Sequence, residues 1–418
     1  MLIQTLKNTW PIFLGIIFLI LGNGLQGTLT GWRATLEGFG PTVTGFVITG
    51  YSIGFLIGSL ITPSLVSRVG HIRVFAALAS LASASVLVQI LYIHPVSWLV
   101  TRLVTGISFA GAFVIVESWL NARSTDRSRG QVLSIYMIVN FISMAGGQSL
   151  LLVADPANFE LFVLASILLS LALVPVLISR VNAPEIHLQQ KMGFVELFKH
   201  APTGTLGVFL AGIAHGSLYG MGAVYASRAG MSVAQTALFM SAFILLGALF
   251  QWPAGWLSDR LDRRIVIAGA AAISAFMSLV LVIWSMSSGW LIASVGILGG
   301  MSLILYSLAV STTNDRLQPE QMVGAGATIA LLWGGGAILG PPTIGMMLDT
   351  FSLDGFFIHL GFIHLVIVSI CLFFIVRHPA VPESEHTPFV AVAPRATPVA
   401  MEALAQDLEN SQLVTEGR

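Results

Sequence analysis

The chain is poor in charged residues and carries a single cysteine. Only 9% of its 418 residues are charged, whereas 56% are hydrophobic. Soluble domains carry about 25% charged residues because their surfaces face water, so this composition excludes a soluble globular domain. A formal net charge of zero gives no electrostatic bias toward nucleic acid. Cys371 alone can form neither an intramolecular disulfide nor a cysteine-based zinc site. We therefore expect no nucleic-acid partner and no cofactor.

Long apolar runs with few charged residues make up most of the chain. Each run is about 20 residues long, which suffices for a helix to cross a bilayer. The first run exceeds the apolar core of a secretory signal and lacks a clear small-x-small cleavage site, so we expect it to be retained. The pattern predicts an all-α membrane protein with twelve transmembrane helices, surrounded by the lipid bilayer. The predicted spans are 11–31, 42–66, 73–93, 97–120, 131–153, 159–179, 204–226, 233–257, 265–286, 290–312, 324–348 and 355–376.

Basic residues between the runs gather on one side of the predicted membrane. The opposite side has only Arg33 and Arg228, with Arg102 just inside the fourth span. By the positive-inside rule the richer side faces the cytoplasm. Both termini are therefore expected in the cytoplasm, in agreement with an even number of spans. The residues on the richer side are Lys7, Arg68, Arg73, Arg123, Arg127, Arg129, Arg180, Lys191, Lys199, Arg260, Arg263, Arg264, Arg316 and Arg377.

The longest connection between runs, residues 180–203, is polar and divides the chain in two. We expect an N-terminal six-helix bundle at 1–182, a cytoplasmic linker at 183–203 and a C-terminal six-helix bundle at 204–378. A weak repeat supports the division, because residues 63–73 resemble residues 255–264 and each segment follows the second run of its half. Residues 379–418 carry five prolines and scattered acids. They predict a disordered cytoplasmic tail, in which 399–409 could form a short helix.

The two repeated segments resemble the basic signature G-x-x-x-D-R-x-G-R-R that follows the second span in the major facilitator superfamily. The first copy keeps Arg68, Gly70 and Arg73. The fourth span contains Arg102-Leu-Val-Thr-Gly106, which is similar to the R-x-x-x-G signature of the same superfamily. Glu117, followed by Arg129-Gly130, is similar to a third signature. The second copy keeps Gly255, Asp259, Arg260, Arg263 and Arg264.

The order of these motifs in a six-plus-six layout implies the major facilitator fold, with two six-helix bundles around one central site, and secondary transport. Three further segments resemble the YcaD-type branch of bacterial facilitators. They are Val-Glu-Ser at 116–118, Gly-Ser-Leu-Tyr-Gly at 216–220 and Gln-Trp-Pro at 251–253. The resemblance implies a small-molecule substrate and the inner (plasma) membrane of a bacterium, and it names no particular substrate.

Ionisable side chains at bilayer depth cost about 2.5–3.5 kcal/mol on insertion scales, so each needs a reason. Arg102 lies about 1.5 turns into the fourth span. It could hold a substrate anion or a proton-carrying acid, or bind carbonyls of a neighbouring helix. His215, near the middle of the seventh span, could carry a proton, or stay neutral and hydrogen-bonded to a neighbouring helix. Tyr219 lies one turn further on the same face, so His215 and Tyr219 are the predicted ligand contacts of the second half.

Amide side chains interrupt the apolar faces of other spans. Asn23 and Gln26 lie among glycines in the first span. They could bind a polar ligand or join neighbouring helices. Asn140 in the fifth span and Gln251 in the eighth are weaker candidates of the same kind.

Charged residues near the predicted cytoplasmic ends of the spans are candidates for a gate. Glu117 lies about 22 Å along the fourth span from Arg102 at 1.5 Å per residue. It could form a salt bridge to the Arg68–Arg73 loop or carry a proton. Asp315 is the expected counterpart in the second half, or an exposed charge without a gating role. The predicted gate residues are Arg68, Gly70, Arg73, Glu117, Asp259, Arg260, Arg263, Arg264 and Asp315.

The glycine run Gly334–Gly336 does not indicate a phosphate-binding loop, because no Lys-Ser/Thr pair follows it. Close helix packing explains these glycines. The adjoining Pro341-Pro342 pair is expected to break the eleventh span and provide a hinge. Without an ATP-binding motif, the energy for transport must come from an ion or substrate gradient.

These patterns predict a secondary active transporter, not an enzyme, that moves a small neutral or weakly polar compound by alternating access. We expect coupling to protons and a monomeric protein. One alternative is a membrane-embedded enzyme acting on a lipid-like substrate, which would need clustered carboxylates or histidines. The other is a transporter-like sensor with residues 379–418 as its output.

Overall fold

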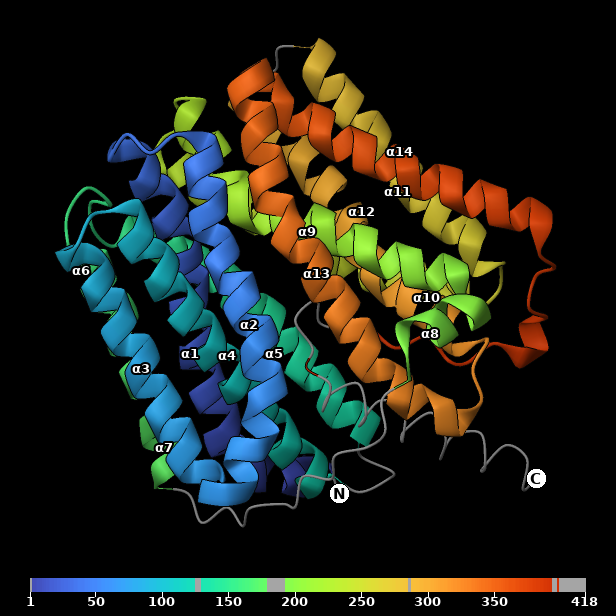
Figure 1. Ribbon diagram of the computed structural model, residues 1–418, viewed down its shortest axis with the longest axis horizontal. Helices are drawn as coiled ribbons and strands as arrows, with labels where there is room; N and C mark the ends of the chain where they lie inside the picture. The colour runs from blue at the N-terminus through green and yellow to red at the C-terminus, as the bar shows by residue number, and fades with distance from the viewer. Residues whose placement is uncertain (1, 125–128, 179–191, 285–286, 393–396, 398–418) are drawn as a thin grey trace.

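The computed structural model describes residues 2–124, 129–178, 192–284, 287–392 and 397, and Figure 1 shows them as a bundle of long helices. Within these ranges the chain forms helices and no strand, which confirms the predicted all-α fold. The short helix predicted at 399–409 lies outside the described residues. The helices are α1 Leu2–Leu36, α2 Pro41–Val69, α3 His71–Leu91, α4 Pro95–Arg123, α5 Arg129–Ser149, η1 Leu150–Leu152, α6 Glu160–Leu171, α7 Leu173–Leu177, α8 Phe194–His200, α9 Pro202–Arg228, α10 Val233–Ser258, α11 Arg263–Ile283, α12 Ser288–Asn314, α13 Pro319–Phe351, α14 Asp354–Arg377 and η2 Glu383–Glu385.

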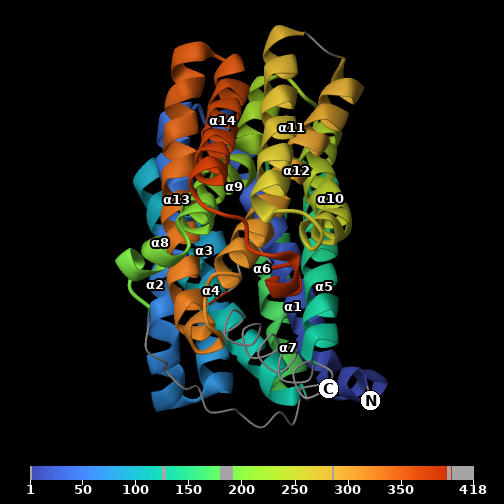
Figure 2. The same cartoon turned by 90° about the vertical axis from the view of Figure 1, so that its right-hand side faces the viewer.

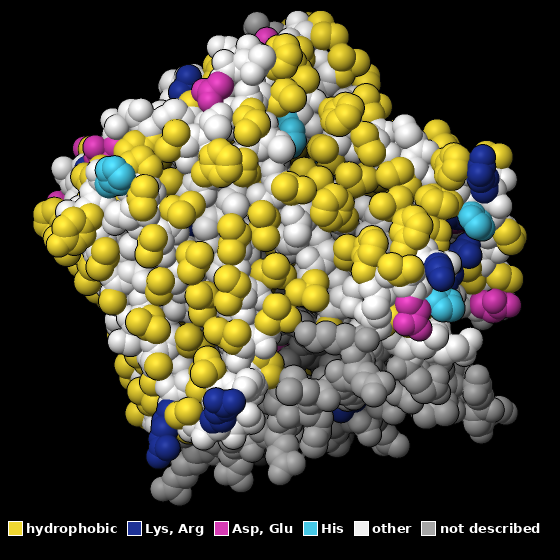
Figure 3. Space-filling view, in the orientation of Figure 1, with side chains coloured by type: hydrophobic (Ala, Val, Ile, Leu, Met, Phe, Trp, Pro, Cys, Tyr) yellow, Lys and Arg dark blue, Asp and Glu magenta, His cyan; other side chains and the backbone are white. Residues whose placement is uncertain are grey.

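The described part of the chain contains 12 helical segments long and apolar enough to cross a membrane. Each of them overlaps one predicted span. Large apolar side chains lie exposed on the outer surface, among them Trp252 (79% exposed) and Phe362 (64% exposed). Figure 3 shows hydrophobic side chains over most of one face, with charged side chains mainly at its margins. An apolar surface of this extent is suited to lipid rather than water, so the chain is an integral membrane protein.

The sixth predicted span, 159–179, is interrupted in the structure. It consists of α6 and the short helix α7, which are separated at Ala172. Pro175 lies in α7 and has no N–H to donate to the carbonyl of Leu171, so the regular helical hydrogen bonding fails there.

The helices gather into two groups, which Figure 1 shows as α1–α7 on the left and α8–α14 on the right. In the first group α2 packs along α4, and in the second α9 packs along α13. The predicted linker falls partly outside the described residues, and within it α8 (Phe194–His200) leads into α9 with only Ala201 between them. The bundle boundaries at residues 182 and 204 stay predictions.

The two groups meet at one end of the molecule, which we call the closed end and which carries the connections 37–40 and 352–353. There Thr42 of α2 donates two hydrogen bonds to Asp349 Oδ2 of α13, from its backbone N–H (3.1 Å) and its hydroxyl (2.6 Å). Close backbone packing accompanies these bonds, because a Cβ on Gly345 would lie 2.6 Å from the Pro41 carbonyl oxygen. Ser241 of α10 also donates to the Ala145 carbonyl of α5 at 3.2 Å. The closed end therefore joins the two groups by specific polar contacts.

The prediction that Pro341-Pro342 breaks the eleventh span is wrong. The helix α13 runs without interruption from Pro319 to Phe351, with both prolines inside it. Pro342 cannot donate to the carbonyl of Ile338 four residues earlier. The hydroxyl of Thr49 in α2 donates to that carbonyl instead, at 3.0 Å. A neighbouring helix thus satisfies the group that proline leaves free, which is how membrane helices tolerate proline.

The prediction of disorder from residue 379 onward is wrong for the residues that the structure describes. Residues 379–392 and Thr397, which we call the tail segment, lie against the helices at the end opposite the closed end, the tail end. Figure 2 shows this segment in red beside α12. Val392 and Thr397 are 5% and 0% exposed. The segment is held because its apolar side chains join the core of the second group and its polar groups bind helix ends, as described below.

Candidate functional site

A cavity of about 60 Å³ lies between the two groups, with walls from α1, α2, α4 and α5 on one side and α9, α10 and α13 on the other. It can hold several water molecules, since one water needs at least about 10–15 Å³. Its lining mixes apolar side chains with hydrogen-bonding ones. The polar and aromatic lining residues are Asn23, Thr28, Tyr51, Ser52, Phe55, Arg102, Gln148, His215, Tyr219 and Trp333.

Arg102 supplies the only charged side chain among the described residues that line the cavity. It is 4% exposed and extends from α4. Its guanidinium carbon lies 4.6 Å from the centre of the Tyr51 ring, a cation–π distance. Since no acidic side chain joins it in the lining, the described wall of the cavity carries one positive charge.

Amides on α1 and α5 form a second polar face of the cavity. Gln148 donates to the carbonyls of Gly24 (3.3 Å) and Met144 (3.2 Å), and its Oε1 accepts from the Thr28 hydroxyl. Asn23 is 4% exposed, and its Nδ2 finds no hydrogen-bond partner among the described residues. A buried amide without a partner costs free energy, so Asn23 is suited to bind a ligand or water.

The hydrogen bonds of His215 identify its neutral form. Trp333 Nε1 donates to His215 Nδ1 at 3.2 Å, and His215 Nε2 lies 3.0 Å from the Ser302 carbonyl oxygen. An indole N–H only donates and a carbonyl only accepts, so His215 accepts at Nδ1 and donates at Nε2. A protonated imidazole would have to donate from both nitrogens. This conformation therefore favours the neutral, hydrogen-bonded alternative over the proton carrier.

Of the seven predicted ligand contacts, Asn23, Arg102, His215 and Tyr219 line the cavity, whereas Gln26, Asn140 and Gln251 do not. Gln26 instead donates to Gln89 of α3 at 3.3 Å, and Asn140 donates to the Tyr136 carbonyl of its own helix at 2.9 Å. Both amides are used within the first group of helices. Six polar or aromatic lining residues were not predicted from the sequence, namely Thr28, Tyr51, Ser52, Phe55, Gln148 and Trp333. Of these residues, only Gln148 could have been predicted, because it is an amide within an apolar run, like Asn23 and Gln26.

Asn23 and Gln26 provide a matched test on one helix. We expect Asn23→Leu to weaken substrate binding, because its amide faces the cavity, and Gln26→Leu to leave the affinity unchanged. Loss of one hydrogen bond to a ligand corresponds to about a 5- to 10-fold change in Kd. The measurement is the Kd of each purified variant for a transported compound. Equal losses in both variants would contradict the placement of the cavity on α1.

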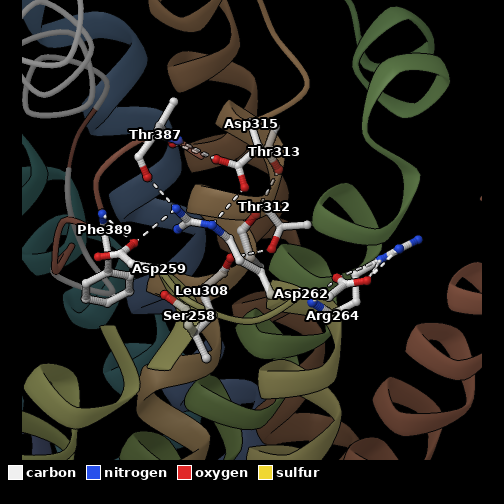
Figure 4. A network of polar contacts seen from close by, with 12 residues as sticks. Ser258, Asp259, Asp262, Arg264, Leu308, Thr312, Thr313, Asp315, Thr387 and Phe389 are labelled. Atoms are coloured by element: carbon white, nitrogen blue, oxygen red, sulfur yellow. Dashed lines mark hydrogen bonds and ion pairs between the residues drawn. The ribbon is translucent and has the colours of Figure 1, made fainter. Parts of the chain in front are cut away.

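A second polar cluster lies at the tail end, around the buried Arg263 of α11 (Figure 4). Its Nε forms an ion pair with Asp315 Oδ2 at 2.7 Å, and its Nη2 donates to Asp259 Oδ1 at 3.2 Å and to the Thr387 carbonyl. The side chains of Arg263 and Asp315 are only 1% and 3% exposed. Burial raises the pKa of Asp315, while Arg263 and hydrogen bonds from Thr387 oppose that rise. Asp315 is therefore buried and paired, not an exposed charge.

Arg264 forms a separate junction between α11 and α14. It binds Asp262 in a bidentate manner, with Nη2–Oδ2 at 2.6 Å and Nε–Oδ1 at 3.0 Å. Its Nη1 donates to the carbonyls of Phe374 (2.9 Å) and His378 (3.0 Å) at the end of α14. Burial alone would raise the pKa of Asp262, but the hydrogen bonds and charge of Arg264 lower it overall. This cluster fastens helix ends within the second group.

The lowered pKa of Asp262 predicts a pH effect on stability. Its pairing stabilises the fold above the pKa of the unfolded chain and is lost as the pH falls through the lower folded pKa. We expect Asp262→Asn to cost about 0.5–1 kcal/mol at neutral pH, because the pair is partly exposed. The cost should shrink as the pH falls below about 4, the ordinary pKa of an aspartate in the unfolded chain, and disappear once the folded carboxylate is also protonated. Asparagine can still cap the N-terminus of α11. The difference in thermal stability between wild type and Asp262→Asn, measured as a function of pH, therefore reports the contribution of the charge. A cost that is constant with pH would contradict the assignment.

The rest of the predicted gate is arranged differently from the expectation. Arg68 and Arg73 are exposed and form no ion pair with any described residue. Gly70 has φ +91° and joins α2 directly to α3, a conformation that favours glycine. Arg260 is exposed and follows α10, and its guanidinium lies over the ring of Trp256 in that helix, at 4.3 Å. These residues do not enter the Arg263–Asp315 cluster.

Glu117 is buried, at 2% exposure, but the expected bridge to the Arg68–Arg73 loop is absent from the described residues. The Tyr136 hydroxyl donates to Glu117 Oε1 at 2.8 Å. The backbone N–H (3.3 Å) and hydroxyl of Thr397 donate to Oε2. In this conformation the tail segment, which was expected to be disordered, reaches this carboxylate instead, and the bridge to the loop stays a prediction.

Comparison with known proteins agrees with this architecture. The family model described as "Major Facilitator Superfamily" matches residues 12–328 and 204–404. The chain is 29% identical to the MFS-type transporter YcaD of Escherichia coli (strain K12), over 86% of this chain and 95% of that protein. It is similar in structure to the nucleoside transporter NupG (TM-score 0.72, 13% identity, 88% of this chain and 98% of that one). It is also similar to a bacterial homologue of the human lysosomal transporter Spinster (TM-score 0.66, 13% identity, 98% and 97% covered). The protein therefore belongs to the major facilitator superfamily and is a membrane transporter.

Proposed function

We propose that the protein is a secondary active transporter for a small organic anion, which binds in the cavity between the two groups of helices. The positive charge of Arg102 carries this proposal, because it is the one charged side chain among the described residues that line the cavity. An arginine binds a carboxylate through two parallel N–H···O bonds. Tyr51, Tyr219 and Trp333 add aromatic surface, and Asn23 adds an unsatisfied amide. The neutral substrate expected from the sequence is revised on these grounds.

Alternating access is supported by the difference between the two ends. At the closed end the groups are joined by the Thr42–Asp349 and Thr49–Ile338 hydrogen bonds. Toward the tail end, α5 and α10 are separated by a groove of about 690 Å³. Packed interfaces are bistable rather than continuously deformable. During transport the groups would therefore separate at the closed end and join at the tail end. The distribution of basic residues supports a cytoplasmic tail end, and with it cytoplasmic termini in a bacterial inner membrane.

Proton coupling is the second part of the proposal. The two predicted proton carriers are His215 and Glu117. The hydrogen bonds of His215 fit a neutral imidazole. Glu117 is buried in the fourth span and accepts hydrogen bonds from Tyr136 and the tail segment. We therefore favour Glu117 as the carrier, in a monomeric transporter. A membrane-embedded enzyme would need a cluster of acids or histidines, and the described residues hold no group of three or more that could bind a metal ion.

The experiment is a binding screen followed by transport. Purified protein is heated with a panel of small carboxylic acids and with the neutral methyl ester of each acid. We expect some acids to raise Tm and their esters to have a much smaller effect. Each acid that raises Tm is then tested by counterflow in proteoliposomes, with and without a proton gradient. Stabilisation by esters equal to that by acids would overturn the anion assignment, and accumulation that ignores the proton gradient would overturn the coupling.

A further inference from the structure

The tail segment binds the second group of helices through backbone and side-chain groups. The backbone N–H and hydroxyl of Thr387 donate to Asp315 Oδ1 at 2.9 and 2.8 Å. The backbone N–H of Phe389 donates to Asp259 Oδ1 at 3.1 Å. Both acceptors stand at the tail ends of helices, after α12 and after α10. These carboxylates, which form the Arg263 cluster, are thus also the docking site of the tail segment (Figure 4).

Phe389 is fitted against α10. Its ring lies over Gly255, where an added Cβ would overlap the ring carbons. Phe389 and Ala391 form part of the wall of the groove between α5 and α10, opposite Met137 and Phe141 of α5. The tail segment therefore occupies space between the two groups at the tail end.

Val392 and Thr397 of the tail segment contact different groups of helices. The backbone N–H of Val392 donates to Ser307 Oγ of α12 at 3.1 Å, and that hydroxyl lies 3.3 Å from the Val392 carbonyl. Thr397 then donates to Glu117 of α4, in the first group. Val392 and Thr397 are both buried. The segment is thus bound to both groups at the end where the groove separates them.

We infer that the tail segment is a built-in strap that stabilises the conformation with the closed end joined and the tail end apart, and that it must leave its seat during each transport cycle. The inference rests on the alternating access proposed above. To join the tail end, α5 and α10 must approach across the groove that Phe389 and Ala391 line. A segment that binds only one conformation shifts the equilibrium toward it. Release of the strap therefore favours the opposite conformation.

Distance measurements between spin labels test the strap without any substrate. Leu65 of α2 and Leu261, in the connection after α10, are exposed residues of the two groups at the tail end. Both are replaced by cysteine in a Cys371→Ser background and labelled. Phe389→Ala should raise the population with a shorter distance by about fivefold relative to the longer one, the effect of one modest contact on an equilibrium constant. Glu385→Gln, an exposed change in the same segment, is the matched control and should have no effect.

A double-mutant cycle separates release of the strap from damage to α10. Gly255→Ala should also shift the distances, since the new methyl group would displace the Phe389 ring. In the Phe389→Ala background it should add nothing, because the two changes break one contact. Unchanged distances in Phe389→Ala, or an equal effect of Gly255→Ala in both backgrounds, would overturn the strap. If the distances shift but no organic anion is transported, the proposed substrate fails while the strap stands.

Discussion

Replacing Arg102 by glutamine should weaken binding of the transported anion by about 10- to 100-fold, the largest functional effect of any single change in the cavity. A hydrogen bond to a charged group contributes about 1.5–3 kcal/mol, and a carboxylate facing glutamine would lose its counter-charge. Arg102 is the only charged side chain of the described lining, so no neighbour can replace it. The measurements are the Kd from ligand-induced stabilisation and the KM from counterflow.

Arg102→Lys is the matched control for Arg102→Gln. Lysine keeps the positive charge but not the planar group that lies over Tyr51 and binds a carboxylate with two parallel bonds. Its affinity should lie between those of wild type and Arg102→Gln. If Arg102→Gln binds the anion as tightly as wild type, the cavity is not an anion site. If it unfolds, the intermediate affinity of Arg102→Lys still tests the proposal.

The largest effect on stability should come from Asp315→Asn. This change removes one member of a buried ion pair whose side chains are 1% and 3% exposed. Breaking a buried pair on one side costs about 3–5 kcal/mol, because the remaining charge, here Arg263, stays buried with only the more exposed Asp259 as a counter-charge. Unfolding in mixed micelles with increasing denaturing detergent measures the loss. Asp259→Asn should cost about 1 kcal/mol or less, because its side chain is 40% exposed.

A double variant separates the charge from the packing. Arg263→Met with Asp315→Leu removes both charges and keeps most of the side-chain volume, and such replacements of buried pairs are often neutral or stabilising. We expect it to recover most of the stability lost in Asp315→Asn. Similar losses for Asp315→Asn and Asp259→Asn would contradict the buried pair. Every variant of Asp315 also weakens the hydrogen bonds from Thr387. The spin-label distances described above therefore show whether the tail segment is still bound in each variant.

The spans could be predicted from the sequence because lipid contact fixes their composition and length, and each span depends only on its own residues. Which side chains meet inside the protein depends on neighbours that no single span reveals. Asn23 and Gln26 lie three residues apart and look equivalent, yet one faces the cavity and the other binds Gln89 of α3. Tyr51 and Trp333 read as ordinary apolar residues until two distant helices bring them to one wall.

The candidate gate residues have some partners close along the chain and others far from it, and their role as a gate stays a prediction. Asp259 and Arg263 are four residues apart, on either side of the connection from α10 to α11, and form an ion pair. One partner of Glu117, Thr397, is 280 residues away, in a segment whose prolines suggested disorder. Composition describes the average behaviour of a segment. Composition does not predict that carboxylates at helix ends bind a few backbone N–H groups of the segment and so order it.

The carbonyl of Ile338 has a further consequence for the transport cycle. Its hydrogen-bond donor, Thr49, belongs to the opposite group of helices, because Pro342 has no backbone N–H. When the two groups part at that end, Thr49 withdraws and the oxygen must be solvated at once, since an unsatisfied carbonyl in a dry interior costs several kcal/mol. Opening and wetting are thereby coupled in one step. The seal can break only toward an aqueous compartment, never toward lipid.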